Sequence, residues 1–304
     1  MRSILIEPRR EYMSRPLKPL TSRLWSAQSQ FANTNSGIIL GGESVCLIDP
    51  GILPIELKAF TDFIASRQVH IEYLILTHSH WDHLFGPEWF PGVPVIAHEN
   101  FDRAMQGEAA GKILRYVERL TTHFEIEREK PFVIPHPDQT ISEMKSLELE
   151  GLEITLIHTP GHAEDHLSIY LPEDGTLWAG DILSDEEIPY IMYSLDAYEA
   201  TLAKLAELDI RCIVPGHGIP TLDASEIKSR LSNDRAYLAR LHEQVERAVA
   251  EGLNVEETGA SCSGFTHPSM AENQNPHKLN IESVYIELGG EADLTRVGWN
   301  QKFD

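Results

Sequence analysis

The sequence predicts a mixed α/β protein in which β-sheets pack together and helices cover them on the outside. Two observations predict this class: strand and helix patterns alternate in two successive rounds along the 304 residues, and strands outnumber helices. The hydrophobic content of 42%, with 20 glycines and 18 prolines, excludes a disordered, collagen-like or low-complexity chain. A chain of this length can bury a sizeable core in one large domain or two smaller ones.

The first round of elements ends in a charged segment. The predicted elements are, in order, a hairpin over 36–50 around a Gly-Gly turn, a helix over 54–67, and buried strands at 73–76 and 94–97. Residues 99–130 are charged and partly helical, with interruptions at Gly107 and Gly111. We expect residues 99–130 to form a cap insertion at the mouth of a pocket.

The second round leads into a helical C-terminal part. Its predicted elements are strands at 145–150, 153–157, 167–171 and 176–178, a helix over 194–208 and a strand at 212–214. A long amphipathic helix is then predicted over 223–252, and a shorter one at 281–288. We expect residues 223–304 to form a helical extension of the domain built by residues 1–222, and to help shape the pocket mouth.

The segment LTHSHWDH, residues 76–83, carries the clearest chemical signal and directly follows an apolar strand. On an extended chain His78 and His80 point to the same side, so they can face one point. Asp82 and His83 follow as the chain turns and can face a second point. Three imidazoles and a carboxylate this close together suit zinc or another borderline divalent metal. Trp81, inside the motif, either walls a pocket or packs beneath it.

Three later segments share one pattern, an apolar strand with a potential ligand at its carboxyl end. ITLIHTPGH ends at His162, TLWAGD at Asp181 and CIVPGH at His217. The Pro-Gly pair before each of these histidines ends its strand in a tight turn, and Gly180 lets the backbone pass close to the site. Strands that end at one rim would assemble a metal site from distant parts of the chain. His158 and His166 are expected at the surface or behind the ligands, and the acidic run 185–187 in a solvated loop.

Composition limits the partners and the compartment. A formal net charge of −22 disfavours nucleic acid and anionic membranes. The three cysteines, at wide spacing, form no disulfide framework, and Cys46 and Cys212 lie in apolar runs where inert, buried thiols are expected. The charged N-terminus lacks the apolar stretch of a signal peptide, and no run approaches the ~20 apolar residues of a membrane span. We expect a cytoplasmic protein that acts on a small molecule, and a homodimer is compatible with these observations.

As a set, HSHWDH, HTPGH, AGD and VPGHG resemble the metallo-β-lactamase-fold hydrolase superfamily in its HxHxDH form. This form is similar to glyoxalase II, to acyl-homoserine lactonases and to lactamases with a His-and-Asp second site. The resemblance covers about residues 30–220 and implies a four-layer αββα sandwich. It implies one metal held by His78, His80 and His162, a second held by Asp82, His83 and His217, and Asp181 as the bridging ligand.

The resemblance also implies a hydrolase. Two zinc ions per chain, with iron or manganese as alternatives, would activate a hydroxide that attacks the carbonyl of an ester, lactone, thioester or β-lactam. Asp82 and Asp181 would then be catalytic as well as ligating. The lactonases place a tyrosine three residues after the bridging Asp, where this chain has Ser184. Tyr190 and Tyr193 follow, and we expect at least one to reach the pocket and donate a hydrogen bond to the developing oxyanion.

Three alternatives are left open. A persulfide-dioxygenase-like enzyme would bind one iron through the equivalents of His78, His162 and Asp181. A phosphodiesterase or nuclease of the same fold is disfavoured by the negative charge and by the absence of a basic patch in the sequence. A non-enzymatic binding protein is disfavoured by the complete set of ligands. The Cys-containing lactamase subclass is excluded, because it carries a thiolate at the position of Asp181.

Overall fold

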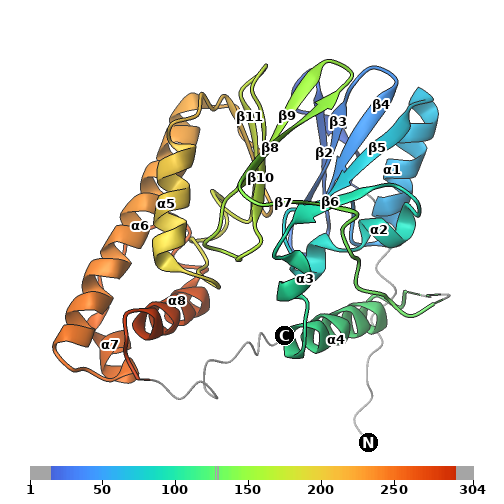
Figure 1. Cartoon of the computed structure of the whole chain (residues 1–304). Helices are drawn as coiled ribbons and strands as arrows, with labels where there is room; N and C mark the ends of the chain where they lie inside the picture. The colour runs from blue at the N-terminus through green and yellow to red at the C-terminus, as the bar shows by residue number, and fades with distance from the viewer. Residues whose placement is uncertain (1–14, 127, 129, 292–304) are drawn as a thin grey trace, which may run out of the picture.

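The structure, a computed structural model, describes residues 15–126, 128 and 130–291. Two β-sheets pack face to face, with helices on both outer sides (Figure 1). The αββα arrangement expected from the resemblance is therefore confirmed. The charged N-terminal segment lies largely outside the described residues, as does the end of the predicted C-terminal extension.

The first sheet has seven strands that follow one another in chain order. They are β1 (Lys18–Pro19), β2 (Leu24–Gln28), β3 (Asn35–Leu40), β4 (Ser44–Ile48), β5 (His70–Ile75), β6 (Val95–His98) and β7 (Gln139–Ile141). The predicted hairpin is the antiparallel pair β3–β4, and β4 to β7 pair in parallel. The carboxyl ends of β4 and β5 therefore lie at the same edge of the sheet.

The second sheet has five strands in the order β12-β11-β10-β9-β8. They are β8 (Met144–Leu149), β9 (Leu152–His158), β10 (Leu167–Leu171), β11 (Thr176–Gly180) and β12 (Cys212–Pro215). β8 to β11 pair antiparallel, and β11 pairs in parallel with β12. The ligand-bearing ends of β9, β11 and β12 all lie at one edge.

Helices complete the outer layers. Their bounds are α1 (Pro54–Arg67), α2 (Gly86–Trp89), α3 (Phe101–Ala104), α4 (Glu108–His123), α5 (Leu195–Leu205), α6 (Ala224–Ala250), α7 (Val255–Ser261) and α8 (Gln274–Glu287). α1 begins at Pro54, whose fixed φ suits a first helical turn, and the residue after its last turn, Gln68, lies in the left-handed region. Gly107 precedes α4, but Gly111 lies inside it, so the predicted interruption at Gly111 is wrong.

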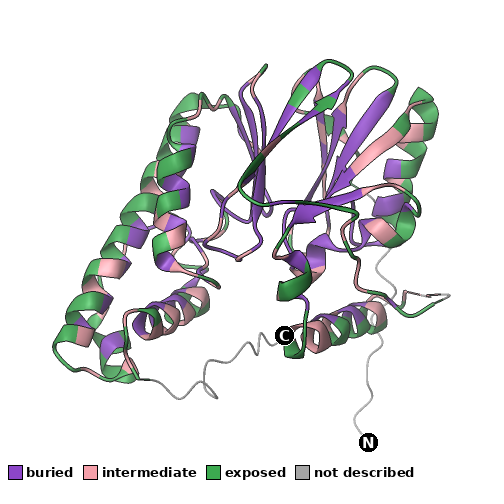
Figure 2. Cartoon of the chain, in the orientation of Figure 1, coloured by how far each residue is buried: buried purple, intermediate pink, exposed green. Residues whose placement is uncertain are grey.

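Apolar side chains form three buried clusters, one between the sheets and one under each set of helices. Figure 2 shows that most residues of the strands in both sheets are buried. In β4, Val45 and Leu47 face the helix side, whereas Cys46 and Ile48 face the other sheet. This alternation with burial on both faces explains the continuous apolar runs in the sequence. Cys46 is buried as predicted, and its burial raises the pKa of the thiol.

The C-terminal helices pack outside the second sheet. α6 lies along α5, and α8 packs against α6 (Figure 1). Asn280 of α8 and the loop before α5 are hydrogen-bonded to one another. In the described part of the chain, no helix combines the length and apolar character that a membrane crossing requires.

Candidate metal centre

The edge of the sandwich brings together the seven predicted ligands. His78, His80, Asp82 and His83 follow β5, and His162, Asp181 and His217 follow β9, β11 and β12. Backbone hydrogen bonds join the two sheets here, from Leu167 N to Thr77 O over 2.7 Å and from Asn35 N to Gly216 O over 2.6 Å. These bonds connect the two sheets where the predicted ligands meet.

The first group of donor atoms comes from His78, His80, His162 and Asp181. These four atoms lie within 4.8 Å of one another. His80 Nδ1 is 2.9 Å from both His78 Nε2 and His162 Nε2, and Asp181 Oδ2 is 3.4 Å from each of the same two nitrogens.

The second group comes from Asp82, His83 and His217, again within 4.8 Å of one another. Asp82 Oδ2 is 3.6 Å from His83 Nε2 and 3.2 Å from His217 Nε2. Asp181 also reaches this group, with Oδ1 at 3.3 Å from His83 Nε2 and Oδ2 at 3.4 Å from His217 Nε2. Its carboxylate thus lies between the two groups.

Two features of these atoms fit a metal. Four ligands at ~2.0–2.1 Å from a tetrahedral zinc ion lie roughly 3.3 Å apart, which matches the spacings around Asp181. His83 Nε2 and Asp181 Oδ1 are fully buried and have no hydrogen-bond partner, although they are only 3.3 Å apart. A buried polar atom without a partner is costly, and a bound cation would satisfy both.

Asp49, which the sequence analysis did not select, orients one histidine in each group. Asp49 Oδ2 accepts hydrogen bonds from Thr77 Oγ1 over 2.6 Å and from His83 Nδ1 over 2.9 Å. Because Thr77 donates to Asp49, its oxygen accepts the proton of His78 Nδ1 over 3.0 Å. The Nε2 atoms of both histidines are therefore left unprotonated and directed at the site.

Backbone carbonyls orient two further predicted ligands. His162 Nδ1 donates to Tyr190 O over 2.9 Å, and His217 Nδ1 donates to Ala32 O over 2.8 Å. Behind Asp181, His166 Nε2 accepts a hydrogen bond from the Asp181 backbone N over 3.0 Å. His166 is buried, so of the two places that the sequence analysis left open for it, the surface is the wrong one.

The electrostatics divide the site into two parts. Burial, followed by the charge of His162, lowers the pKa of His80 to about 3, which keeps this imidazole neutral and ready to ligate. Burial also disfavours the cation of His83, but the carboxylates of Asp181 and Asp82 outweigh this effect and raise its pKa well above the ordinary value. A bound metal would take the place of the proton that these carboxylates favour on His83.

The Pro-Gly turn before His217 has a steric reason. A Cβ added to Gly216 would lie 1.9 Å from Asp181 Oδ1, so only glycine lets this turn pass the carboxylate. Glycine is therefore needed at position 216 because the Asp181 carboxylate lies so close, and not because the backbone there has a positive φ.

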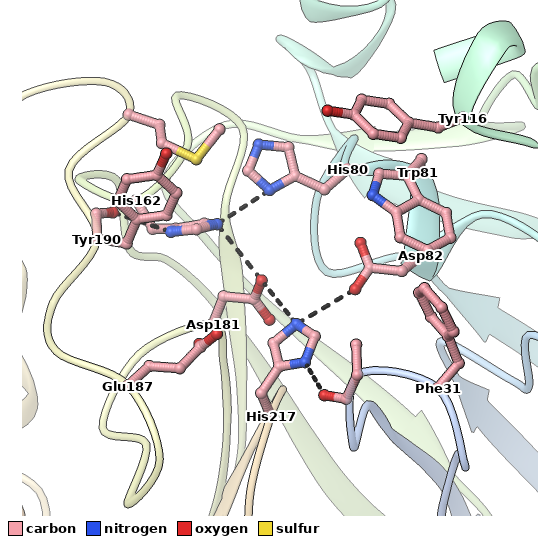
Figure 3. Close-up of a pocket in the computed structure, with 12 residues that line it drawn as sticks. Phe31, His80, Trp81, Asp82, Tyr116, His162, Asp181, Glu187, Tyr190 and His217 are labelled. Atoms are coloured by element: carbon pink, nitrogen blue, oxygen red, sulfur yellow. Dashed lines mark hydrogen bonds and ion pairs between the residues drawn. The ribbon is translucent and has the colours of Figure 1, made fainter. Parts of the chain in front are cut away.

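The pocket above the ligands has a volume of about 300 Å³ (Figure 3). Phe31, Trp81 and Tyr116 stand on one side, and Tyr190 stands beside His162 on the other. Trp81 and Tyr116 stack with their centroids 5.9 Å apart and their planes 18° apart. Trp81 is therefore a wall of the pocket, and α4 contributes Tyr116 to the same wall.

Of the two predicted tyrosines, Tyr190 lines the pocket and Tyr193 does not. Tyr193 is 48% exposed and contacts Glu164 on the surface, because the chain turns outward after Met192 to begin α5. Burial raises the pKa of Tyr190 to about 12, so its hydroxyl keeps its proton at neutral pH. Ser184 is buried and donates to His217 O over 2.8 Å, which stabilises the turn that carries this ligand.

The predictions about the acidic run 185–187 and about the C-terminal helices both need correction. In the acidic run 185–187, Glu186 is exposed, but Glu187 lines the pocket, so it is not a solvated residue. None of the described residues of the C-terminal helices lines the pocket, and these helices contact it through the loop before α5.

A third group of acidic and histidine side chains lies on α5 and α6. It consists of Asp196, Glu199 and His242 and is partly exposed.

Sequence reasoning missed Asp49, Phe31, Tyr116 and Glu187. Asp49 follows the buried strand β4 just as the predicted ligands follow theirs, so the same pattern could have found it. The other three come from separate loops and a helix, and only the tertiary structure brings them together.

Comparison with known proteins agrees with this geometry. A family profile described as the Metallo-beta-lactamase superfamily matches residues 30–217. The chain is 28% identical over 221 residues to a protein named Beta-lactamase-like protein 2 homolog from Caenorhabditis elegans, covering 70% of this chain and 67% of that one. It is 24% identical over 279 residues to a protein named Atrochrysone carboxyl ACP thioesterase from Aspergillus chevalieri, covering 87% and 78%.

Solved structures share the fold. A sec-alkylsulfatase from Pseudomonas sp. superposes with a TM-score of 0.70 at 16% identity, over 93% of this chain, which spans about half (52%) of that protein. A metallo-beta-lactamase family protein from Thermus thermophilus superposes with a TM-score of 0.59 at 22% identity, over 87% of this chain and 95% of that one. With the matched profile extending over more than half of its length, the chain belongs to the metallo-beta-lactamase superfamily and is an enzyme of the hydrolase type.

Proposed function

We propose that the protein is a binuclear zinc hydrolase that cleaves the carbonyl ester or thioester bond of a small, largely apolar substrate. The observation that carries this proposal is the position of the Asp181 carboxylate, within 3.4 Å of nitrogens from both groups of donor atoms. His78, His80 and His162 would hold one ion, and Asp82, His83 and His217 the other. Bound zinc supplies an acidified water and polarises a carbonyl, so no protein nucleophile is needed.

The chain's own residues prepare the site for this chemistry. Hydrogen bonds to Asp49, Thr77, Tyr190 and Ala32 select the tautomers that present Nε2 to the ions. The protonated hydroxyl of Tyr190 at the pocket wall is the proposed donor to the oxyanion. Asp82 and Asp181 ligate and, as carboxylates, offset the charge of the metals.

The pocket supports a substrate with an apolar, aromatic-sized group. The side chains of Phe31, Trp81 and Tyr116 offer flat faces for such a group. Among the described lining residues no lysine or arginine occurs, and Glu187 adds a carboxylate. Away from the proposed metal ions, a carboxylate or phosphate of the substrate would meet no cationic side chain among these residues, so we propose that this part of the substrate is neutral or cationic. The relative named as a thioesterase is consistent with a thioester carbonyl.

A substrate panel tests this proposal. The zinc-loaded protein should hydrolyse neutral aryl esters and acyl thioesters with higher kcat/KM than a phosphodiester or a secondary alkyl sulfate. Lactones and β-lactams are included in the same panel, so that their kcat/KM values can be compared with those of the esters and thioesters. The variant His80→Ala is the control, and it should lose zinc and hydrolysis together. Preferred cleavage of the phosphodiester, or oxygen uptake by the iron-loaded protein with a persulfide, would contradict the proposal.

A further inference from the structure

The loop between Asp181 and α5 is held from behind by one buried side chain of α8. Asn280 is fully buried, and its Nδ2 donates to Pro189 O over 2.6 Å. Its Oδ1 accepts from Ile191 N over 2.8 Å. Because one partner can only accept and the other can only donate, the orientation of the amide is unambiguous. Asn280 therefore binds the backbone on both sides of Tyr190.

Tyr190 connects this contact to the metal centre. Its carbonyl oxygen accepts the Nδ1 proton of His162, and its ring stands beside the imidazole with the two centroids 6.0 Å apart. The same residue lines the pocket. A rotation of the peptide groups flanking Tyr190 would move both the carbonyl that orients His162 and the hydroxyl that faces the substrate.

The amide of Asn280 is itself held by α6. Its Nδ2 also donates to Tyr237 Oη over 2.9 Å, and that hydroxyl lies 2.9 Å from His277 Nδ1. Tyr237 and His277 are both buried. Every polar atom of the Asn280 side chain thus has a partner, which leaves this side chain one stable orientation.

Further contacts hold the earlier part of the same loop. Asn273 donates to Glu186 O over 2.8 Å, and Ser269 donates to Asp185 O over 2.8 Å. These bonds flank Glu187 on its N-terminal side, as those of Asn280 flank Tyr190. The C-terminal segment thus contacts the backbone next to Glu187 and Tyr190, two of the pocket residues of this loop, and none of its described residues lines the pocket.

We propose that Asn280 is a positioning residue for His162 and Tyr190, and that the C-terminal helices are part of the catalytic unit through this amide. The proposal rests on the proposed function for its catalytic consequence, but its structural content, the orientation of His162, does not need substrate. Side chains that orient metal ligands from behind typically change metal affinity or activity by ~10–100-fold when they are removed.

The experiment compares Asn280→Ala with Tyr285→Phe in the full chain. Tyr285 lies on the same helix and donates to Leu253 O over 2.9 Å, far along the chain from the loop, so its variant removes one hydrogen bond of α8 without touching Tyr190. Zinc affinity is measured by chelator competition, and kcat and KM at saturating zinc. Asn280→Ala should weaken one of two zinc equivalents by ~10–100-fold and lower kcat, whereas Tyr285→Phe should change neither.

A second readout separates this proposal from the function. The Nδ1–H resonance of His162, assigned by its loss in His162→Gln, should be visible in the wild-type protein without metal or substrate and broadened by exchange in Asn280→Ala. Should Asn280→Ala fail to fold, Tyr237→Phe, which removes the hydroxyl that holds the amide, should cause a smaller broadening of the same resonance. An unchanged resonance in a folded variant, with zinc affinity equal to that of Tyr285→Phe, would overturn the proposal even if the protein is a hydrolase. If the protein has no hydrolase activity but Asn280→Ala still broadens this resonance, the positioning role of Asn280 stands and only the proposed function fails.

Discussion

At the residue scale, Asp49 is expected to affect metal binding strongly although it is not one of the predicted ligands. It has a φ of 41°, in the left-handed region, which asparagine tolerates well. Asp49→Asn therefore preserves the backbone and size but replaces one acceptor oxygen with a donor, which conflicts with the protons of Thr77 and His83. We expect zinc affinity to fall by ~10–100-fold, as measured by chelator competition.

The control for this change is Asp165→Asn. Asp165 is also buried and accepts from Ser79 Oγ over 3.2 Å, and burial raises the pKa of its carboxyl to about 6. No contact joins it to the ligand nitrogens among the described hydrogen bonds, so this variant should bind zinc like the wild-type protein. Equal affinities in Asp49→Asn and the wild type would show that the histidines do not need Asp49.

A second prediction at this scale concerns the two tyrosines. If the Tyr190 hydroxyl stabilises the oxyanion, Tyr190→Phe should lower kcat by ~10²–10³-fold with zinc content unchanged. Tyr193→Phe is the matched control and should keep kcat, because Tyr193 is half-exposed and outside the pocket. Steady-state kinetics with metal analysis decides between them. Equal kcat values for both variants would leave oxyanion stabilisation to the metals.

At the scale of elements, prediction succeeded where one segment determines its own structure. The helix predicted over 54–67 agrees with α1 because proline marks its start and the apolar spacing marks its length. The ligand-bearing strands were also found, because each is an apolar run with its polar residue at the end. β1, β2 and β7 were missed because they are short, or mix polar with apolar residues, and are identified only by their partners in the sheet.

In the candidate site, too, residues in local motifs could be predicted from the sequence and the others could not. The seven ligand positions belong to short local motifs, so their identity follows from the sequence, although their roles as metal ligands stay a prediction. Glu187, Phe31 and Tyr116 have no such motif, because their function depends on three segments meeting over one rim. Asn280 lies still further away in the chain, and only its contacts with residues 189 and 191 show its importance.

The turn that carries His162 gives the prediction at this scale. Gly161 has a φ of 142°, and a Cβ added there would lie 2.5 Å from the Cα of Tyr198 in α5. Gly161→Ala should therefore push the turn away from the helix, destabilise the protein by ~1–3 kcal/mol and weaken zinc binding. Denaturant unfolding measures the first effect, and chelator competition the second.

Gly111→Ala serves as the contrast. Gly111 lies within α4, where the nearest atom to an added Cβ is the mobile end of Arg115 at 3.2 Å. This change should stabilise the protein by ~0.5–1 kcal/mol, because alanine favours helix more than glycine does. Similar unfolding free energies for the two variants would mean that the contact of the turn with α5 is not tight.

At the scale of the whole molecule, the net charge of −22 acts on any charged substrate. Raising the salt concentration from about 0.01 M to about 1 M shortens the Debye length from ~30 Å to ~3 Å and screens this charge. For matched esters, kcat/KM should then fall by up to roughly 10-fold for a cationic substrate, rise for an anionic one and stay constant for a neutral one. A salt dependence shared by all three esters would instead point to an effect on the metal site.

The central claim, that two metal ions share the Asp181 carboxylate, is tested most directly by counting zinc in the folded chain. Native mass spectrometry of the zinc-saturated protein gives the number of ions per chain together with the number of chains. The account predicts two zinc ions per chain, and a loss to one or none in Asp181→Ala, because this carboxylate contacts both groups of ligands. A single ion per chain in the wild-type protein at saturating zinc would contradict it.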